Sequence, residues 1–126
     1  MKQIITTNNA PAPIGPYNQA VLFKDTLYMS GQVAFNPETM ELVLDDIPSE
    51  THQVMANLKA VLEAANMTFE NVVKTTIFLS DMNNFNQVNE VYGSYLNEAT
   101  APARETVQVA KLPRNVNVEI SMIAVK

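Results

Sequence analysis

The sequence predicts an α+β fold in which two helices pack on one face of a mixed β-sheet. Three observations predict this class: one segment has apolar residues at helical spacing, another is apolar on both alternating faces, and the predicted elements follow in the order β-β-α-β-α-β-β. The chain has 126 residues, of which 47% are hydrophobic and 17% charged. We therefore expect a single domain over residues 1–126 with one core.

The first predicted elements are two strands within YNQAVLFKDTLYMSGQVAF (17–35), which follow the proline-rich loop NNAPAPIGP. They turn at Lys24-Asp25, and NPETME (36–41) predicts a second turn. The next segment, SETHQVMANLKAVLEAAN (49–66), predicts a helix with Ser49 as its N-cap after Pro48. Its apolar face consists of Val54, Leu58, Val61, Leu62 and Ala65.

The middle of the chain predicts a central strand and a second helix. VVKTTIFLS (72–80) is β-branched and apolar on both faces, as expected for a strand covered on two sides. NNFNQVNEVYGSYLNE (83–98) follows with helical periodicity. Its apolar stripe consists of Phe85, Val88, Tyr92, Tyr95 and Leu96.

ETVQVAKL (105–112) and VNVEISM (116–122) predict a closing hairpin across LPRN. If the apolar residues of the two strands share one face, the polar residues share the other. That polar face would hold Arg104, Thr106, Gln108, Asn117, Glu119 and Ser121. Arg104 and Glu119 would then lie roughly 13 Å apart, too far for an ion pair, so a ligand or a partner chain could fill the gap. Alternatively, Arg104 is only a solvated charge at the end of a strand.

The composition excludes several classes of protein and site. The net charge is −5, from 13 acidic and 8 basic residues, and the basic residues are scattered, so nucleic-acid binding is not expected. Without cysteine, the chain has no disulfides, thiolate metal sites or cysteine nucleophile. The segment MKQIITTNNAPAP lacks the apolar core of a signal peptide, and no apolar run is long enough to span a bilayer. We therefore expect a cytoplasmic protein without membrane contact.

Several segments in order resemble the Rid (YjgF) family, specifically its RidA-type enamine/imine deaminases. They are GPY (15–17), SGQ (30–32), VVKTTIFLSDMNNF (72–85), VNEVY (88–92), APAR (101–104) and KLPRNVNVEISMIAV (111–125). The resemblance spans essentially the whole chain. It implies a chorismate-mutase-like fold that assembles as a homotrimer with three clefts between subunits.

The resemblance also implies an activity, the hydrolysis of reactive 2-imino acids such as 2-iminobutanoate and 2-iminopropanoate to 2-keto acids and ammonia. Pyridoxal-phosphate-dependent serine and threonine dehydratases release these species. The family's enzymes themselves use no cofactor and no metal.

Carried onto this sequence, the resemblance implies a carboxylate-binding Arg104 and a water-positioning Glu119. The residues that match the lining of the family's cleft are Tyr17, Ser30, Gly31 and Asn89. Many RidA-type members have a cysteine two residues after the arginine, where this chain has Thr106. That position contacts the substrate in the family mainly through its backbone carbonyl.

General chemistry agrees with the two main assignments. A guanidinium offers two parallel donors to a planar carboxylate and stays charged at physiological pH. A carboxylate beside a water molecule can accept a proton during attack on the imine and return it to the leaving ammonia. For each residue a plainer interpretation stays open: Glu119 as a solvated charge, Tyr17 as a turn residue, and Ser30 or Asn89 as local hydrogen-bonding groups.

Two other functions stay open from the sequence. The same cleft could sense a 2-keto acid such as 2-oxobutanoate and report it to a partner without turnover. Some relatives are described as ribonucleases or translation inhibitors. An acidic chain without a basic stripe argues against direct attack on RNA.

Overall fold

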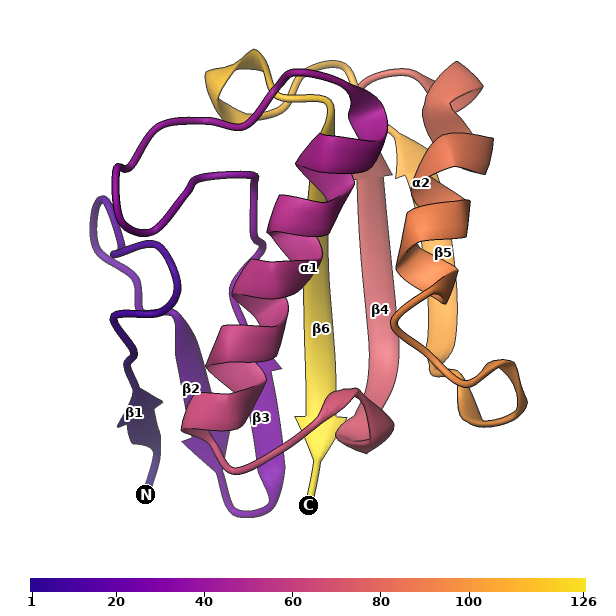
Figure 1. Ribbon diagram of the computed structural model, residues 1–126. Coiled ribbons are helices and arrows are strands. Elements are labelled where there is room, and N and C mark those ends of the chain that lie inside the picture. Colours follow the sequence, from indigo (N-terminus) through magenta and orange to yellow (C-terminus); the bar gives the residue numbers. More distant parts are fainter.

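Six strands form one mixed sheet, and two helices cover one of its faces (Figure 1). The computed structural model describes residues 1–126. The strands are β1 (Gln3–Ile5), β2 (Ala20–Phe23), β3 (Thr26–Met29), β4 (Val72–Leu79), β5 (Ala103–Gln108) and β6 (Val118–Val125), and the helices are α1 (Ile47–Ala64) and α2 (Phe85–Gly93). The spatial order is β1-β2-β3-β6-β4-β5. The predicted α+β class is therefore confirmed. Neither helix combines the length and the apolar character that crossing a bilayer would require.

The predicted hairpin at Lys24-Asp25 is confirmed as the antiparallel pair β2 and β3. Lys24 takes a positive φ of 54°, which closes this tight turn. The N-terminal strand β1, which pairs with β2, was not among the predicted elements. With three residues, β1 is too short to show a period-2 pattern.

Helix α1 has the predicted apolar face, but the predicted N-cap is wrong. The helix begins before Pro48, and Asp46 is its N-cap, with a carboxylate that accepts a hydrogen bond from the Ser49 amide at 2.7 Å. Proline lacks an amide hydrogen and fits the first turn of a helix, where that hydrogen has no partner. Pro48 therefore lies inside the first turn, and the helix starts three residues earlier than the prediction based on Ser49 as the N-cap.

Helix α2 is shorter than the predicted one and ends at Gly93. Val88 and Tyr92 are buried in the core as predicted. Tyr95 and Leu96 lie beyond the end of the helix and pack against the core as half-buried residues. The apolar stripe therefore continues past the last helical residue.

The predicted closing hairpin is wrong, because β5 and β6 are not neighbours. Strand β4 lies between them, parallel to β5 and antiparallel to β6. The chain passes from β4 through α2 to β5, which is the ordinary crossover between parallel strands. It then crosses to the opposite edge of β4, so that this apolar strand has a partner on each side.

This topology reverses the predicted face of Arg104. Arg104 is opposite Thr75 of β4, and Thr75 is also opposite the buried Met122 of β6. Arg104 therefore lies on the face that carries the helices, and Thr106 and Gln108 follow it on the same face. Glu119 is opposite Phe78 and lies on the other face. The prediction that Arg104 and Glu119 share a face is therefore wrong.

The face of the sheet opposite the helices, which we call the outer face, is open in this chain (Figure 1). It exposes large apolar side chains, among them Tyr28, with half of its surface accessible, and Val107, at 42%. Ile123 and Val125 of β6 are half-buried on this face, opposite Tyr28 and Thr26. The chain itself therefore covers β4 on one face only, not on the two sides predicted.

Candidate functional site

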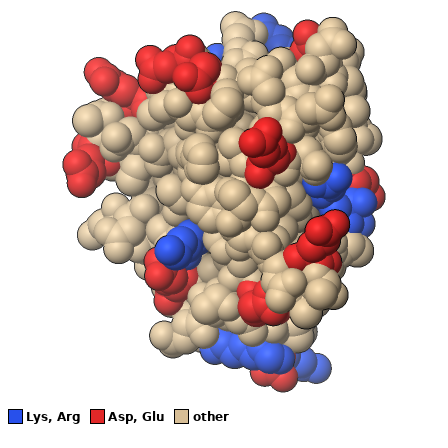
Figure 2. Space-filling model, turned by 45° about the vertical axis from the view of Figure 1, so that its right-hand side comes forward, with Lys and Arg blue, Asp and Glu red and all other residues tan.

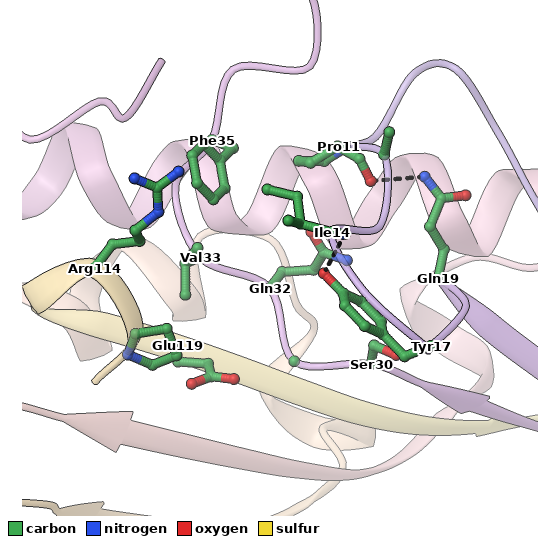
Figure 3. A pocket seen from close by; sticks show the side chains of 13 residues that line it. Pro11, Ile14, Tyr17, Gln19, Ser30, Gln32, Val33, Phe35, Arg114 and Glu119 are labelled. Atoms are coloured by element: carbon green, nitrogen blue, oxygen red, sulfur yellow. Dashed lines mark hydrogen bonds between the residues drawn. The ribbon is translucent and has the colours of Figure 1, made fainter. Parts of the chain in front are cut away.

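The surface has two cavities, and each is lined by one of the chain's two arginines. The first has a volume of about 470 Å³ and contains Glu119 and Arg114 (Figure 3). The second has a volume of about 440 Å³ and contains Arg104 and Asn89. We call them the Glu119 cavity and the Arg104 cavity.

Glu119 supplies the only carboxylate of its cavity. It is the second residue of β6, and its side chain is half-buried. Burial raises the pKa of the Glu119 carboxyl above its ordinary value of 4.5, because a desolvated carboxylate is disfavoured in its charged form. A carboxylate with a raised pKa takes up a proton more readily than one in water, which suits it to general acid-base work.

Gly31 leaves the space that the Glu119 carboxylate occupies. Gln32 and Ile120 form an antiparallel bridge, with a hydrogen bond from each amide to the other carbonyl at 2.8 and 3.1 Å, so residues 31–32 run alongside β6. A Cβ atom on Gly31 would overlap Oε2 of Glu119. The absence of a side chain at Gly31 is therefore part of the construction of this cavity.

Ser30 and Gln19 hold the loop before β2, which forms the wall of the Glu119 cavity opposite β6. The Ser30 hydroxyl donates to the Asn18 carbonyl at 2.6 Å, which leaves its oxygen free to accept a further hydrogen bond from the cavity. Gln19 is buried, and its amide nitrogen donates to the carbonyls of Thr7, Ala10 and Pro11. Its side-chain oxygen accepts from the Thr7 amide at 2.7 Å. One buried side chain thus fixes the loop in place.

Tyr17 lies at the mouth of the Glu119 cavity (Figure 3). Its ring is half-exposed, and its hydroxyl accepts a hydrogen bond from the Ile14 amide at 3.2 Å. Gly15 between them has a φ of +123°, which favours glycine and allows the loop to turn back on itself. Tyr17 therefore closes a turn and at the same time lines the cavity.

The Arg104 cavity lies beside α2, and α2 supplies the groups around the guanidinium. Arg104 donates a hydrogen bond of 2.6 Å to the side-chain oxygen of Asn89. Its guanidinium carbon is 5.3 Å from the ring centroid of Tyr92 and 5.6 Å from that of Phe85, which are distances for cation–π contacts. Asn89 and the two rings thus hold the guanidinium, which remains exposed to solvent on its other side.

Two further groups are fixed near Arg104. Tyr92 donates a hydrogen bond of 3.0 Å to the hydroxyl of Thr75, and burial raises the pKa of Tyr92, an effect that this bond and the charge of Arg104 oppose. Thr106 is the next residue on the same face of β5, and its hydroxyl oxygen is buried without a hydrogen-bond partner. A buried hydroxyl of this kind is costly and is uncommon in folded proteins.

The predicted site residues therefore form two separate groups. Tyr17, Ser30, Gly31 and Glu119 line one cavity. Arg104 and Asn89 line the other, and Thr106 is their neighbour in β5. Because the two groups lie on different faces of the sheet, one chain does not bring Arg104 to Glu119.

Sequence reasoning missed Arg114, the second charged residue of the Glu119 cavity. Its guanidinium carbon lies 5.5 Å from the ring centroid of Phe35 (Figure 3). Arg114 was treated only as part of the predicted LPRN turn. No local pattern reveals its position, because the contact with Phe35 joins residues far apart in the sequence.

A buried carboxylate, Glu50 of α1, supports the start of β6 and was also missed. It accepts hydrogen bonds from the amides of Asn117 at 2.8 Å and Val118 at 3.0 Å, and from the Asn117 side chain at 2.7 Å. Glu119 follows directly after Val118. Glu50 therefore fixes the backbone that carries the carboxylate of the cavity.

The two cavities offer complementary chemistry. The Glu119 cavity has a carboxylate with a raised pKa and space for a small molecule, and the Arg104 cavity has a guanidinium that can bind a carboxylate. No group of three or more His, Cys, Asp or Glu side chains is arranged to hold a metal ion.

Comparisons with known proteins cover the whole chain. Residues 7–126 match the sequence model of the family described as Endoribonuclease L-PSP. The mouse protein 2-iminobutanoate/2-iminopropanoate deaminase is 48% identical over 126 residues, covering 100% of this chain and 93% of the mouse protein. The solved structure of YyfA, a Rid family protein of Yersinia pestis, has a TM-score of 0.97 at 48% identity, with 100% of both chains covered. The structure of Escherichia coli TdcF with bound serine has a TM-score of 0.92 at 39% identity, with 98% of each chain covered.

Proposed function

The chain belongs to the Rid (YjgF, L-PSP) family, and on this basis we propose that it hydrolyses reactive 2-imino acids, such as 2-iminobutanoate and 2-iminopropanoate, to 2-keto acids and ammonia. The observation that carries this proposal is the half-buried Glu119 carboxylate, with its raised pKa, held against Gly31 in a cavity of about 470 Å³. Relatives that carry the deaminase name match this chain over its full length.

In the proposed reaction, Glu119 handles the protons and water is the nucleophile. The carboxylate accepts a proton from the water that attacks C2 of the protonated imine, and the product of this step is a carbinolamine. The Glu119 carboxylic acid then returns the proton to the amine nitrogen. The C–N bond breaks as the C2 hydroxyl becomes a carbonyl and gives its proton to the departing ammonia. Overall, one iminium ion and one water molecule are converted to one keto acid and one ammonium ion. Positioning and mild acid-base help are sufficient for an electrophile of this kind.

We further propose that Arg104 binds the carboxylate of the imino acid and comes from a neighbouring subunit. In one chain Arg104 and Glu119 lie on opposite faces of the sheet, so a site that uses both has to form between chains. The open outer face, with exposed Tyr28 and Val107, supports association through this face, and β5, which carries Arg104, is the edge strand of the sheet and can reach a neighbouring chain. The proposed assembly is a homotrimer with three such sites, and Asn89 would orient the arginine in each.

A mixing experiment tests both the activity and the division of the site. Purified protein at catalytic amounts should speed the appearance of 2-oxobutanoate from threonine in the presence of a threonine dehydratase. Arg104→Ala and Glu119→Gln should each lose this effect. Mixed trimers of the two variants should regain it, because one of the three sites in each mixed trimer combines an intact arginine with an intact glutamate. If mixed trimers form but no activity returns, the two residues do not share an intersubunit site. If the unmodified protein causes no acceleration, the deaminase proposal is wrong.

A second candidate function uses the same cavity for sensing a small acid without turnover. The TdcF structure holds serine, a small amino acid, which favours a binding role in at least one relative. Stoichiometric binding of 2-oxobutanoate without faster keto-acid release would support the sensor.

The family description names an endoribonuclease, but the charges of this chain argue against direct RNA cleavage. The net charge is −5, and Figure 2 shows Lys and Arg in small separate groups among Asp and Glu on the face in view. Binding to a polyanion requires clustered positive charge. Cleavage of a labelled single-stranded RNA by the purified protein would overturn this argument.

A further inference from the structure

Arg114 is the only positively charged residue of the Glu119 cavity. The one ion pair of the chain joins Lys74 to Glu105, so the Arg114 guanidinium is not engaged with a carboxylate. Figure 3 shows it at one end of the cavity beside the ring of Phe35, with Glu119 and Tyr17 farther along. Its hydrogen-bond donors are therefore available to a molecule in the cavity.

The backbone at Arg114 is held in a conformation that few residues other than glycine adopt. Arg114 has a φ of 58° and Asn115 a φ of 55°, so two successive residues take the left-handed conformation. This pair reverses the chain just before β6 and accompanies the contact of the guanidinium with Phe35 at 5.5 Å. Left-handed residues of this kind concentrate at binding and catalytic sites.

Electrostatics give Arg114 a role that Arg104 does not fill. Glu119 and Arg114 are the only charged residues lining the cavity, so Arg114 offsets the carboxylate that would otherwise repel an anionic substrate. In the proposed reaction the carboxylate next to the imine is bound by Arg104 of a neighbouring subunit. The guanidinium of Arg114 is then free for a second anionic group on the same substrate.

We propose that Arg114 binds a side-chain carboxylate of the substrate, so that the Glu119 cavity accepts dicarboxylic 2-imino acids in addition to those with neutral side chains. This inference rests on the proposed imine hydrolysis. A cavity of about 470 Å³ lies within the range that holds ligands larger than a four-carbon acid.

The test compares two imines that differ in the side-chain carboxylate. An amino-acid oxidase with catalase generates 2-iminobutanoate from 2-aminobutanoate and 2-iminoglutarate from glutamate, and semicarbazide traps the imine that escapes hydrolysis. The quantity measured is the ratio of kcat/KM for 2-iminoglutarate to that for 2-iminobutanoate. Arg114→Gln should lower this ratio by about tenfold, and Arg114→Lys by less, because lysine keeps the charge and loses the paired donors.

Lys111→Gln is the matched control. Lys111 lies, like Arg114, in the connection between β5 and β6, but it is exposed and lines neither cavity. The substitution removes one positive charge there, so the ratio should stay at the parent value. Calorimetric binding of 2-oxoglutarate and 2-oxobutanoate gives a second readout that needs no turnover, and Arg114→Gln should weaken the first ligand selectively.

The outcomes separate this inference from the proposed function. An unchanged ratio in Arg114→Gln, or an equal loss for both imines, overturns the role of Arg114 even if the parent protein is an active deaminase. An equal loss would mean that Arg114 binds the carboxylate common to both substrates. A parent protein that hydrolyses neither imine contradicts the proposed function, and the binding ratios then decide the role of Arg114.

Discussion

Replacing Gly31 with alanine should disable the site with little effect on folding. The new Cβ atom would overlap Oε2 of Glu119, so the carboxylate has to withdraw by about 1 Å or more to reach an ordinary contact distance. The φ of Gly31 is not in the left-handed region, so the backbone accepts alanine without strain. The substitution therefore acts on one carboxylate.

The expected loss follows from the displacement. Misplacing a reacting group by about 1 Å can cost about 100-fold in rate, which corresponds to about 2.7 kcal/mol of transition-state stabilisation. Restricting the unfolded chain gives Gly→Ala about 0.4–1 kcal/mol of stability, which opposes the cost of moving the side chain of Glu119. We therefore expect about 100-fold lower kcat/KM and a nearly unchanged melting temperature.

A double-mutant cycle distinguishes a steric effect on Glu119 from other causes. The four proteins are the parent, Gly31→Ala, Glu119→Ala and the double variant, each assayed for hydrolysis of 2-iminobutanoate. In the Glu119→Ala background there is no carboxylate to displace, so adding Gly31→Ala should change the residual rate by less than about twofold.

Two results would refute this reasoning. A fully active Gly31→Ala protein would mean that the carboxylate position is not critical. An equal loss in both backgrounds would mean that Gly31 acts independently of Glu119. Thermal unfolding and the oligomeric state of all four proteins show whether a loss comes from misfolding.

Three further predictions concern charged residues. Arg104→Ala should lower kcat/KM for imine hydrolysis by at least about tenfold, and Arg104→Lys by less, with unfolding temperatures unchanged; a fully active Arg104→Ala trimer would contradict the carboxylate assignment. Because burial raises the pKa of Glu119 in the folded protein, its contribution to stability is present below about pH 4.5 and is lost as pH rises through the raised pKa. The stability of the parent relative to Glu119→Gln should therefore fall with rising pH in denaturant titrations, while activity, which needs the carboxylate ionised, should rise; a pH-independent difference would argue against the raised pKa. Glu50→Leu leaves the amides of Asn117 and Val118 without their acceptor and should cost about 1–3 kcal/mol for each, whereas Glu50→Gln keeps one oxygen and should cost less; equal unfolding free energies for the parent and Glu50→Leu would contradict this.

Elements with a local signal were predictable from the sequence. The buried face of α1 follows from its periodicity, and the hairpin at Lys24-Asp25 follows from a polar turn between two apolar runs. The N-cap of α1 was misplaced because Ser49 and Asp46 are both good capping residues, and the position of Pro48 fits either.

Strand pairing had no such local signal. The wrong prediction that Arg104 and Glu119 share a face came from the wrong pairing of β5 with β6. The alternation of apolar and polar residues in ETVQVAKL and VNVEISM fits two arrangements equally well: a hairpin, and two strands on either side of β4. In strand β5 the apolar and polar residues lie on the faces opposite to those expected. Val107 is exposed on the outer face, while the polar residues Arg104 and Thr106 lie on the face covered by the helices. A pattern of this kind is expected where a partner or a ligand completes the structure, and one chain alone does not encode that partner in a local motif.

The position of β6 has a consequence for how the chain acquires its structure. β6 is the last of the six strands along the chain, yet it lies between β3 and β4 and joins the two halves of the sheet. During synthesis, β1 to β3 and the β4-α2-β5 unit emerge first and have no hydrogen bonds to each other. The edges of β3 and β4 that face β6, and the part of α1 that packs on β6, stay uncovered until residues 118–125 leave the ribosome. In this interval the nascent chain exposes strand edges that can pair with neighbouring chains, so the risk of aggregation is greatest before β6 is in place.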